Sequence, residues 1–481
     1  MKKFNIFITL LLTSLSLIFA QPRAEQVTPL DINVQNNFSS TNTQSILNSS
    51  DITSSLIEIN NIYRYIDANF LYEVDPDKVK EGLASGLMNS LGDEYSYYIS
   101  KEDSQEYAED TSGTYVGIGT YLTKMNPSYT DYKDPKTYMV QIVSPFPGGP
   151  ADRAGIRAND LISHVNGQDI SELNDKEASK LIRGSKGEPI TLTIHRGDST
   201  FDITLKPEVV TTPNLTKGVI GNNIGYIFIY SFNLQTGNLV KEAIEELLKQ
   251  NIKGLIIDLR NNGGGTVDTA LQIADFFIDD GPLLTIEFKE GSKNQPIRYI
   301  ANEGSIVPQD LPIVILANGG TASSSEILTA ALKENGRATV IGSKTFGKGI
   351  MQNVIAFLDG YIQFTYAHYL TPLNNDIHKV GIEPDILVED IEYTKEEMAS
   401  YAKFVNTSAV KDYVEKNSTY SIENIEHFAK ENADSNVPST ILKLLVRNEY
   451  IYMMDYEDRP IVDTTYDEQL NRALQYFEQG K

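Results

Sequence analysis

The chain has 481 residues, enough for about three domains at the usual 100–200 residues per domain. Hydrophobic residues make up 41% and charged residues 22%, a globular composition that excludes a collagen, a coiled coil and a fully disordered chain. The 41 basic and 65 acidic residues give a net charge of −24, which disfavours nucleic acid and anionic lipid as partners.

Cysteine is absent, which excludes disulfides, a thiolate zinc site, a cysteine nucleophile and a lipoprotein anchor. The five histidines are scattered, and no two of them have the spacing of a helical metal-binding pair. We therefore expect no metal site and no cofactor.

The first 20 residues predict export. Lys2 and Lys3 precede an apolar stretch from Phe4 to Phe19, and Ala20 is a small residue of the kind found at cleavage sites. The stretch is short for a spanning helix and contains several polar residues. We expect a signal peptide over 1–20, with an uncleaved N-terminal anchor as the alternative. The mature protein is then extracytoplasmic, in the periplasm or cell envelope.

Residues 21–50 are rich in Ser, Thr, Asn and Gln, which predicts a flexible leader. A helical region over 51–112 follows. Apolar residues share one face of a first helix at Leu56, Ile59, Tyr63, Ile66 and Phe70. Asp75–Pro76 is typical of the start of a second helix, which Gly92 is expected to end.

The pattern changes twice further along the chain. Residues 113–208 read as short strands and turns, with strand-like alternation at 191–195. Residues 209–392 alternate strands with helices, which predicts an α/β domain with largely parallel pairing. Strands are expected at 225–232, 255–259, 313–317 and 339–341, and helices at 240–248, 266–278 and 325–334. Residues 393–481 read as mostly helical, with Leu470, Leu474 and Phe477 on one face.

Two glycine-rich stretches look like nucleotide-binding loops but depart from them. Gly342–Gly349 resembles a phosphate-binding loop, yet Gly349 stands where a Ser or Thr must ligate magnesium. Gly117-Ile-Gly119 lacks the third glycine of a dinucleotide loop. Neither stretch predicts nucleotide binding.

Two strand–turn–helix junctions are better candidates for chemistry: Asp258–Gly265 and Asn318–Glu326. Each places backbone N–H groups at the carboxyl edge of a sheet beside a helix N-terminus, as an oxyanion hole requires. The alternatives stay open, because Ser323-x-x-Glu326 also fits a capping box and the first junction is also consistent with a tight turn.

No histidine lies near these junctions, so a lysine is the candidate base. Lys348 stands between Gly347 and Gly349, which allow the chain to bend tightly. An ordinary lysine has a pKa of about 10.4, so burial must lower the pKa of Lys348 by about two to three for it to act near pH 7. The alternative is a solvated loop lysine.

Together these stretches resemble the carboxy-terminal processing peptidases, or tail-specific proteases, which are serine proteases with a PDZ domain and a Ser-Lys dyad. The resemblance runs from about residue 55 to about residue 392. The family's Ser-Ala-Ser-Ala-Ser-Glu-Ile block is similar to Thr321–Ile327, and its Thr-Phe-Gly-Lys-Gly motif is present at Thr345–Gly349, followed by Gln352. The family's nucleophile precedes its lysine by 25 residues, as Ser323 precedes Lys348.

Further stretches resemble the family's other motifs. They are the oxyanion loop at Asp258–Asn262, the last core motif at Thr371–Asp385, the PDZ segments at Gly149–Gly155 and Val165–Gly167, and the carboxylate-binding loop at Tyr115–Gly119. Three positions depart from the family pattern: Gly263 replaces a frequent proline, Thr321 replaces a serine, and Ser324 replaces an alanine.

The resemblance implies a multidomain α+β chain. Its protease core would be a spiral α/β fold of the ClpP/crotonase type, with a PDZ domain at 113–208 inserted before the core at 209–392 and helical regions at both ends. Ser323 would be the nucleophile, Lys348 the base and Gln352 the residue that orients the lysine. The amides of Gly264 and Ser324 would form the oxyanion hole. Glu334 lies where relatives can carry an acid, or is a solvated acid at a helix end.

The resemblance also implies how substrates are chosen. Val116, Gly117, Ile118 and Gly119 would hold the terminal carboxylate of an apolar protein tail, and Arg183 would contact the tail or the protease domain, or be a surface arginine. We expect protein substrates with apolar C-termini, a homodimer and an activating partner, and a membrane contact only through an uncleaved N-terminus. The alternatives are an inactive PDZ scaffold that binds C-termini and an acyl-thioester enzyme on a related fold.

Overall fold

The computed structural model describes residues 50–124, 135–302, 304–391, 393–405, 407–454, 459–462 and 464–479. The predicted signal peptide and, except for Ser50, the predicted leader lie outside the described residues. The chain forms two compact units. The larger contains the described residues of Glu106–Ile350 and His368–Lys481, and the smaller those of 50–105 and Met351–Ala367. Over the described ranges, no helix has the length and apolar character needed to cross a membrane.

The smaller unit combines helices with a short sheet. Its elements are α2 (Ser50–Asn69), α3 (Pro76–Asn89), the first turn of α4 (Lys101–Ser112), β1 (Tyr97–Ile99), most of β17 (Ile350–Phe357) and most of β18 (Gly360–Leu370). The side chain of Asp75 accepts hydrogen bonds from the amides of Asp77 and Lys78, which confirms the predicted start of α3. β1 and β17 both pair with β18. The apolar face predicted for the first helix is present on α2 but largely exposed in the single chain.

The larger unit is built around a six-stranded sheet. Its strands, in spatial order, are β10 (Leu215–Ile220), β11 (Ile224–Ile229), β12 (Leu255–Asp258), β15 (Ile313–Ala317), β16 (Thr339–Gly342) and β19 (Ile386–Leu387). β10 and β11 are antiparallel, and every other neighbouring pair is parallel. The prediction of largely parallel pairing is therefore confirmed. β13 (Pro282–Phe288) and β14 (Ile297–Ile300) pair with each other in antiparallel orientation, outside the six-stranded sheet.

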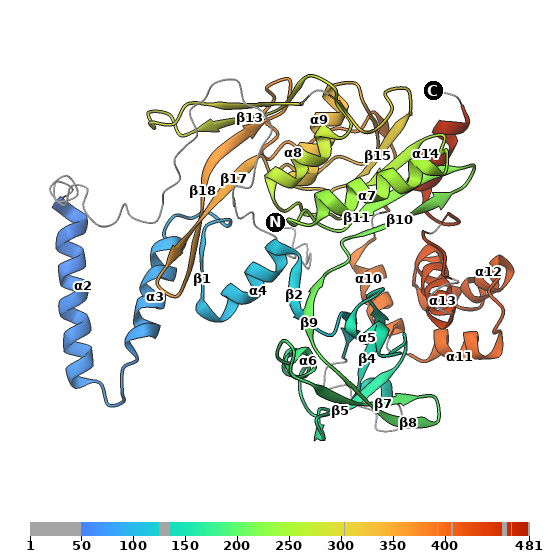
Figure 1. Cartoon of the computed structure of the whole chain (residues 1–481), viewed down its shortest axis with the longest axis horizontal. Coiled ribbons are helices and arrows are strands. Elements are labelled where there is room, and N and C mark those ends of the chain that lie inside the picture. The colour runs from blue at the N-terminus through green and yellow to red at the C-terminus, as the bar shows by residue number, and fades with distance from the viewer. Residues whose placement is uncertain are drawn as a thin grey trace. The chain divides into compact units, whose positions relative to one another are not determined.

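Four helices pack on this sheet or on one another: α7 (Thr236–Lys249), α8 (Val267–Asp275), α9 (Ser324–Glu334) and α14 (Glu468–Glu478) (Figure 1). α8 ends three residues before the predicted Ile278. α14 was predicted only as an amphipathic helix, yet Leu470 and Ala473 lie in one hydrophobic cluster with Tyr226 and Ile256 of the sheet. A helix far along the chain thus completes the core around β11 and β12.

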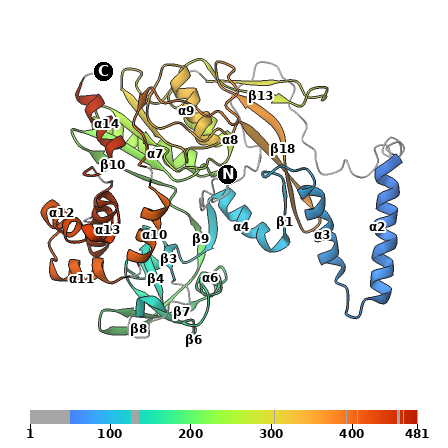
Figure 2. The ribbon, with the colours of Figure 1, turned by 180° about the vertical axis from the view of Figure 1, so that it is seen from behind.

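A second sheet follows the turn-rich pattern predicted for residues 113–208. Its strands are β3 (Thr120–Thr123), β4 (Val140–Pro145), β5 (Leu161–Val165), β6 (Gln168–Asp169), β7 (Ile190–Arg196) and β8 (Ser199–Leu205). β3 lies at one edge. Two helices accompany it: α5 (Pro150–Arg153), labelled in Figure 1, and α6 (Asp175–Arg183), labelled in Figure 2. A separate ladder joins β2 (Thr114–Gly117) to β9 (Glu208–Thr211).

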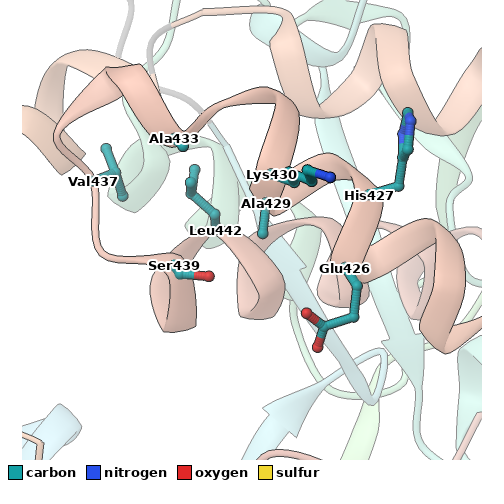
Figure 3. Close-up of a pocket in the computed structure, with 8 residues that line it drawn as sticks. All are labelled: Glu426, His427, Ala429, Lys430, Ala433, Val437, Ser439 and Leu442. Atoms are coloured by element: carbon teal, nitrogen blue, oxygen red, sulfur yellow. The ribbon is translucent and has the colours of Figure 1, made fainter.

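Helices also dominate the C-terminal region, as predicted. They are α10 (Lys395–Phe404), α11 (Ala409–Lys416), α12 (Ile422–Glu431) and α13 (Ser439–Met453), and they share a hydrophobic cluster of their own. A cavity of about 500 Å³ opens between α12 and α13, lined by Glu426, Ala429, Leu442 and their neighbours (Figure 3). None of the predicted site residues lines this cavity.

Candidate active site

Ser323 lies at the turn between β15 and α9, directly before the first residue of the helix. Its backbone has φ +55° and ψ −119°, a region that non-glycine residues seldom adopt. Strained strand-to-helix turns of this kind present nucleophilic serines in hydrolases. The local backbone therefore suits a nucleophile, and the half-buried position leaves Ser323 partly accessible.

Glu326, one turn into α9, connects Ser323 to the loop that carries Lys348. Its side chain is fully buried. One carboxylate oxygen accepts the N–H groups of Ser323 at 3.0 Å and of Lys348 at 2.8 Å. The other accepts the Thr345 hydroxyl at 2.6 Å and the Gly347 N–H at 2.7 Å. The Glu326 half of the predicted capping box is thus present, but the same carboxylate also fixes the lysine loop.

Tyr369, on β18, provides a second link between the two residues. Its hydroxyl lies 3.2 Å from the carbonyl oxygen of Ser323 and also contacts the carbonyl oxygen of Lys348. The structure therefore brings Ser323 and Lys348 together through two shared partners. The Lys348 residue is only 7% exposed, so it is not a solvated loop lysine.

The glycines on either side of Lys348 are required by close packing. Gly347 has φ +89°, and a Cβ there would lie 2.7 Å from the amide nitrogen of Gly381. A Cβ on Gly349 would lie 2.7 Å from the amide nitrogen of His378. The segment predicted as the last core motif therefore presses against the lysine loop, and it is anchored there by a 2.7 Å hydrogen bond from the Lys379 N–H to the Gly347 carbonyl.

The loop after β12 lies beside the nucleophile candidate. A Cβ on Gly264, whose φ is +100°, would lie 2.8 Å from both the Cβ of Ser323 and the amide nitrogen of Ser324. The Gly264 N–H, however, donates to the Asn262 side chain at 2.9 Å. In this conformation the amide predicted for the oxyanion hole already has an acceptor. Its assignment stays a prediction that requires the Gly264 amide to turn.

The extra hydroxyl of Ser324 has a structural explanation. It donates to the carbonyl of Gly265 at 2.8 Å, and the neighbouring Ser325 hydroxyl donates to the carbonyl of Asn262 at 2.9 Å. Both hydroxyls thus fasten the start of α9 to the oxyanion loop. As the first helical residue, Ser324 also has an N–H without an intrahelical acceptor, which suits the predicted oxyanion amide.

A buried ion network that the sequence did not predict supports the same loop. The Arg260 guanidinium lies 2.6 Å from a carboxylate oxygen of Asp258 and 2.7 Å from one of Asp467, at the start of α14. Tyr226 donates to Asp258 at 2.8 Å. Arg260 stood within a recognised motif, but no sequence signal pointed to Asp467, which is 207 residues away.

Two other predicted residues lie in different surroundings. Gln352 is on β17, 3% exposed, and its amide donates to the Thr365 hydroxyl at 3.3 Å. It belongs to the smaller unit, so its orienting role stays a prediction. Glu334, at the end of α9, accepts from the Leu373 N–H at 2.7 Å and the Asn375 side chain at 3.1 Å. Glu334 therefore supports a turn.

The predicted carboxylate-binding residues run from β2 into β3. Val116 and Gly117 end β2, and Ile118 and Gly119 form the turn before the edge strand β3. Arg183, at the end of α6, lies with its Nη1 2.5 Å from the Glu109 carboxylate and its guanidinium 5.0 Å from the centre of the Tyr115 ring. Its contact with a tail stays a prediction.

Three family models match separate parts of the chain. The model of peptidase family S41 matches residues 223–388, a PDZ domain model matches 141–196, and the model of the activating protease CtpB N-terminal domain matches 19–103. A probable CtpA-like serine protease of Staphylococcus aureus (strain COL) is 35% identical over 348 residues, which cover 72% of this chain and 67% of the relative.

The carboxy-terminal processing protease CtpA of Bacillus subtilis (strain 168) is also 35% identical, over 74% of this chain and 72% of its own length. A solved photosystem II D1 C-terminal processing protease is 29% identical and covers 63% of this chain and 80% of its own, with a TM-score of 0.38. A PDZ domain and a protease core in one multidomain α+β chain define a PDZ-containing serine-type peptidase. The chain belongs to peptidase family S41, among the carboxy-terminal processing proteases, which confirms the resemblance seen in the sequence.

Proposed function

We propose that the protein is an extracytoplasmic endopeptidase that recognises apolar C-terminal tails through its PDZ domain and cleaves peptide bonds with a Ser323–Lys348 dyad. The observation that carries this proposal is the pair of shared partners, Glu326 and Tyr369, that hold the backbones of Ser323 and Lys348 together. The core is proposed to be the spiral α/β fold of the ClpP/crotonase type.

In the proposed reaction, Ser323 Oγ attacks the scissile carbonyl while the neutral Lys348 amine takes its proton. The lysine later gives this proton to the leaving amine. Gln352 orients the lysine. The amides of Ser324 and Gly264 stabilise the oxyanion, an effect of about 3–4 kcal/mol per donor. The Gly264 amide first turns away from Asn262 to face the oxyanion.

Specificity is proposed to come from the edge strand β3. An extended tail adds to this edge as a further strand, backbone amides of the Val116–Gly119 loop hold its terminal carboxylate, and an apolar pocket takes its last side chain. An activating partner and a homodimer are proposed to act through the helical regions. Export is proposed to depend on residues 1–20, and cell fractionation with and without them tests it.

The test compares the protein from about residue 25 with its Ser323→Ala, Lys348→Ala and Ser324→Ala variants. Each is incubated with a loosely folded protein that ends in an apolar tail, or with the same protein ending in two aspartates, and fragments are read by mass spectrometry. We expect cleavage of the apolar-tailed substrate alone, its loss in the first two variants, and its retention in the control Ser324→Ala. Cleavage that survives Ser323→Ala would refute the dyad.

A further inference from the structure

A cavity of about 370 Å³ lies between the carboxylate-binding loop, α6, the end of α4 and the edge of the protease core. Ile118 and Thr120 line it from the loop, Ile182 and Arg183 from α6, and Glu109 from α4. All of these residues belong to the larger unit. The cavity is the space beside β3 into which the proposed function places a substrate tail.

The loop is held by its carbonyl groups. The Ile118 carbonyl accepts from the Ala151 N–H at 2.8 Å, and the Gly119 carbonyl accepts from the Phe146 N–H at 2.9 Å. In a trans peptide the carbonyl and the following N–H point in opposite directions. The N–H groups of Gly119 and Thr120 therefore point away from Ala151 and Phe146.

The Tyr115 side chain lies beside these two N–H groups. The Tyr115 ring folds back over Gly117, so close that a Cβ on Gly117 would lie 2.4 Å from the ring. Burial raises the pKa of Tyr115, and the neighbouring Thr120 and Gly119 amides lower it in part. Tyr115 thus covers the position that a tail carboxylate would take.

Arg183 holds the ring in this position. Its guanidinium lies 5.0 Å from the centre of the Tyr115 ring, within the range of a cation–π interaction. The same guanidinium is also paired with the Glu109 carboxylate, whose oxygen lies 2.5 Å from Nη1 of Arg183. Leaving the loop would therefore take Tyr115 away from Arg183 as well.

Within the described part of the chain, the Thr120 hydroxyl at the loop lacks a hydrogen-bond acceptor, which a carboxylate would supply. Thr120 is only 8% exposed and lines the cavity, yet its Oγ1 has no hydrogen-bond partner among the residues the structure describes. A buried hydroxyl without a partner is unfavourable. A carboxylate has two oxygens with about four acceptor sites, so it can take both amides and the Thr120 hydroxyl together. The single Tyr115 hydroxyl oxygen, which lies beside the two amides, does not bond the Thr120 hydroxyl.

We propose that Tyr115 is an internal competitor that occupies the carboxylate-binding loop, and that a protein tail binds by displacing it and using the Thr120 hydroxyl as an added ligand for its free C-terminal carboxylate. The inference rests on the tail recognition in the proposed function and adds two residues that set its affinity. Only molecules whose loop is free of Tyr115 can bind a tail. The apparent affinity for the tail is therefore reduced by the fraction of molecules in which Tyr115 covers the loop.

The test measures binding of a fluorescein-labelled ten-residue peptide with an apolar C-terminus, as the free acid and as the amide, by anisotropy. All assays use the full-length protein with the Ser323→Ala substitution, so that bound peptide is not cleaved. Tyr115→Phe keeps the ring but removes the competing oxygen, and we expect about 3–10-fold tighter binding of the free acid only. Thr120→Val should weaken binding of the free acid about 3–10-fold.

Tyr413→Phe is the matched control, because it removes a tyrosine hydroxyl that donates to the Asn424 carbonyl among the C-terminal helices, away from this cavity and from β3. It should leave both affinities unchanged. As an independent readout, hydrogen exchange of the Gly119 and Thr120 amides should be faster in Tyr115→Phe than in its parent.

Unchanged or weaker binding of the free acid by Tyr115→Phe would overturn the proposal, as would unchanged amide exchange. These results are separable from those for proteolysis. A wild type that cleaves the apolar-tailed substrate while Tyr115→Phe leaves affinity unchanged keeps the proposed function and removes the competitor. Tighter binding by Tyr115→Phe without any wild-type cleavage keeps the competitor and removes the proposed proteolysis.

Discussion

Glu326→Gln is the substitution that most directly tests how the site is held. In the structure both carboxylate oxygens of Glu326 accept two hydrogen bonds each, in a position with no solvent exposure. Glutamine keeps one acceptor oxygen and replaces the other with an NH₂ group. The less costly orientation points the NH₂ toward Thr345, whose hydroxyl can rotate to accept, and leaves the Gly347 N–H facing a donor.

One buried N–H without an acceptor costs about 1–3 kcal/mol, so the free energy of unfolding should fall by that amount. Because Gly347 adjoins Lys348, the repelled amide should also move the lysine. A misplacement of about 1 Å can lower the rate about 100-fold, so we expect kcat to fall about 10–100-fold with KM changed only a few-fold.

Urea unfolding followed by circular dichroism gives the stability, and initial rates on the apolar-tailed substrate give kcat and KM. Glu334→Gln is the control, because the same change is made on the same helix at a half-buried carboxylate that supports a turn. It should change neither quantity appreciably. Wild-type kcat in Glu326→Gln, whatever its stability, would refute the claim that this carboxylate positions the lysine.

Three further outcomes follow from the contacts described. Gly347→Ala should lower the free energy of unfolding by about 2–4 kcal/mol and remove most activity, because φ is +89° and the added Cβ would clash with the backbone of Gly381. Retained activity in a cleavage assay would contradict this expectation. Ser324→Ala should lower the free energy of unfolding by only about 0.5–1.5 kcal/mol, because it removes one hydroxyl hydrogen bond. Its kcat should stay within a few-fold of the wild-type value in an assay that includes the inactive Ser323→Ala variant. Asp467→Asn keeps the helix cap but removes one of the two carboxylate charges that pair with Arg260. Urea titration should therefore show a free energy of unfolding lower by about 1.5–3 kcal/mol.

Local patterns predicted most of the secondary structure. The strand over Ile313–Ala317 has the predicted bounds, and the helix that begins at Ser324 differs by one residue at its start, because a buried apolar run and a serine-rich helix start are both short-range signals. The glycines around Lys348 were predicted to allow a tight bend. The structure shows in addition that no side chain fits there, a fact that depends on a segment some 30 residues further along the chain.

What the sequence could not predict are contacts between distant segments. Ser323-x-x-Glu326 indicated a cap within one helix, and the same pattern cannot reveal that the Glu326 carboxylate also accepts from Gly347 and Lys348. The Tyr115 ring was part of a recognised loop motif, but its fold back over Gly117 depends on Arg183 and on burial. Nor did the periodicity of α14 indicate which sheet it covers, because an apolar face shows only that a helix is buried somewhere.

The contact between Arg260 and Asp467 has a consequence for when the enzyme first becomes competent. Ser323, Lys348 and both oxyanion segments are synthesised well before α14. Until Asp467 and the apolar face of α14 arrive, Arg260 lacks one of its two carboxylate partners and the sheet around Tyr226 lacks its covering helix. A chain in the course of synthesis therefore carries every proposed catalytic residue while the oxyanion loop is still unsupported. Such a delay would protect neighbouring unfolded chains from cleavage while the protease itself is still being made.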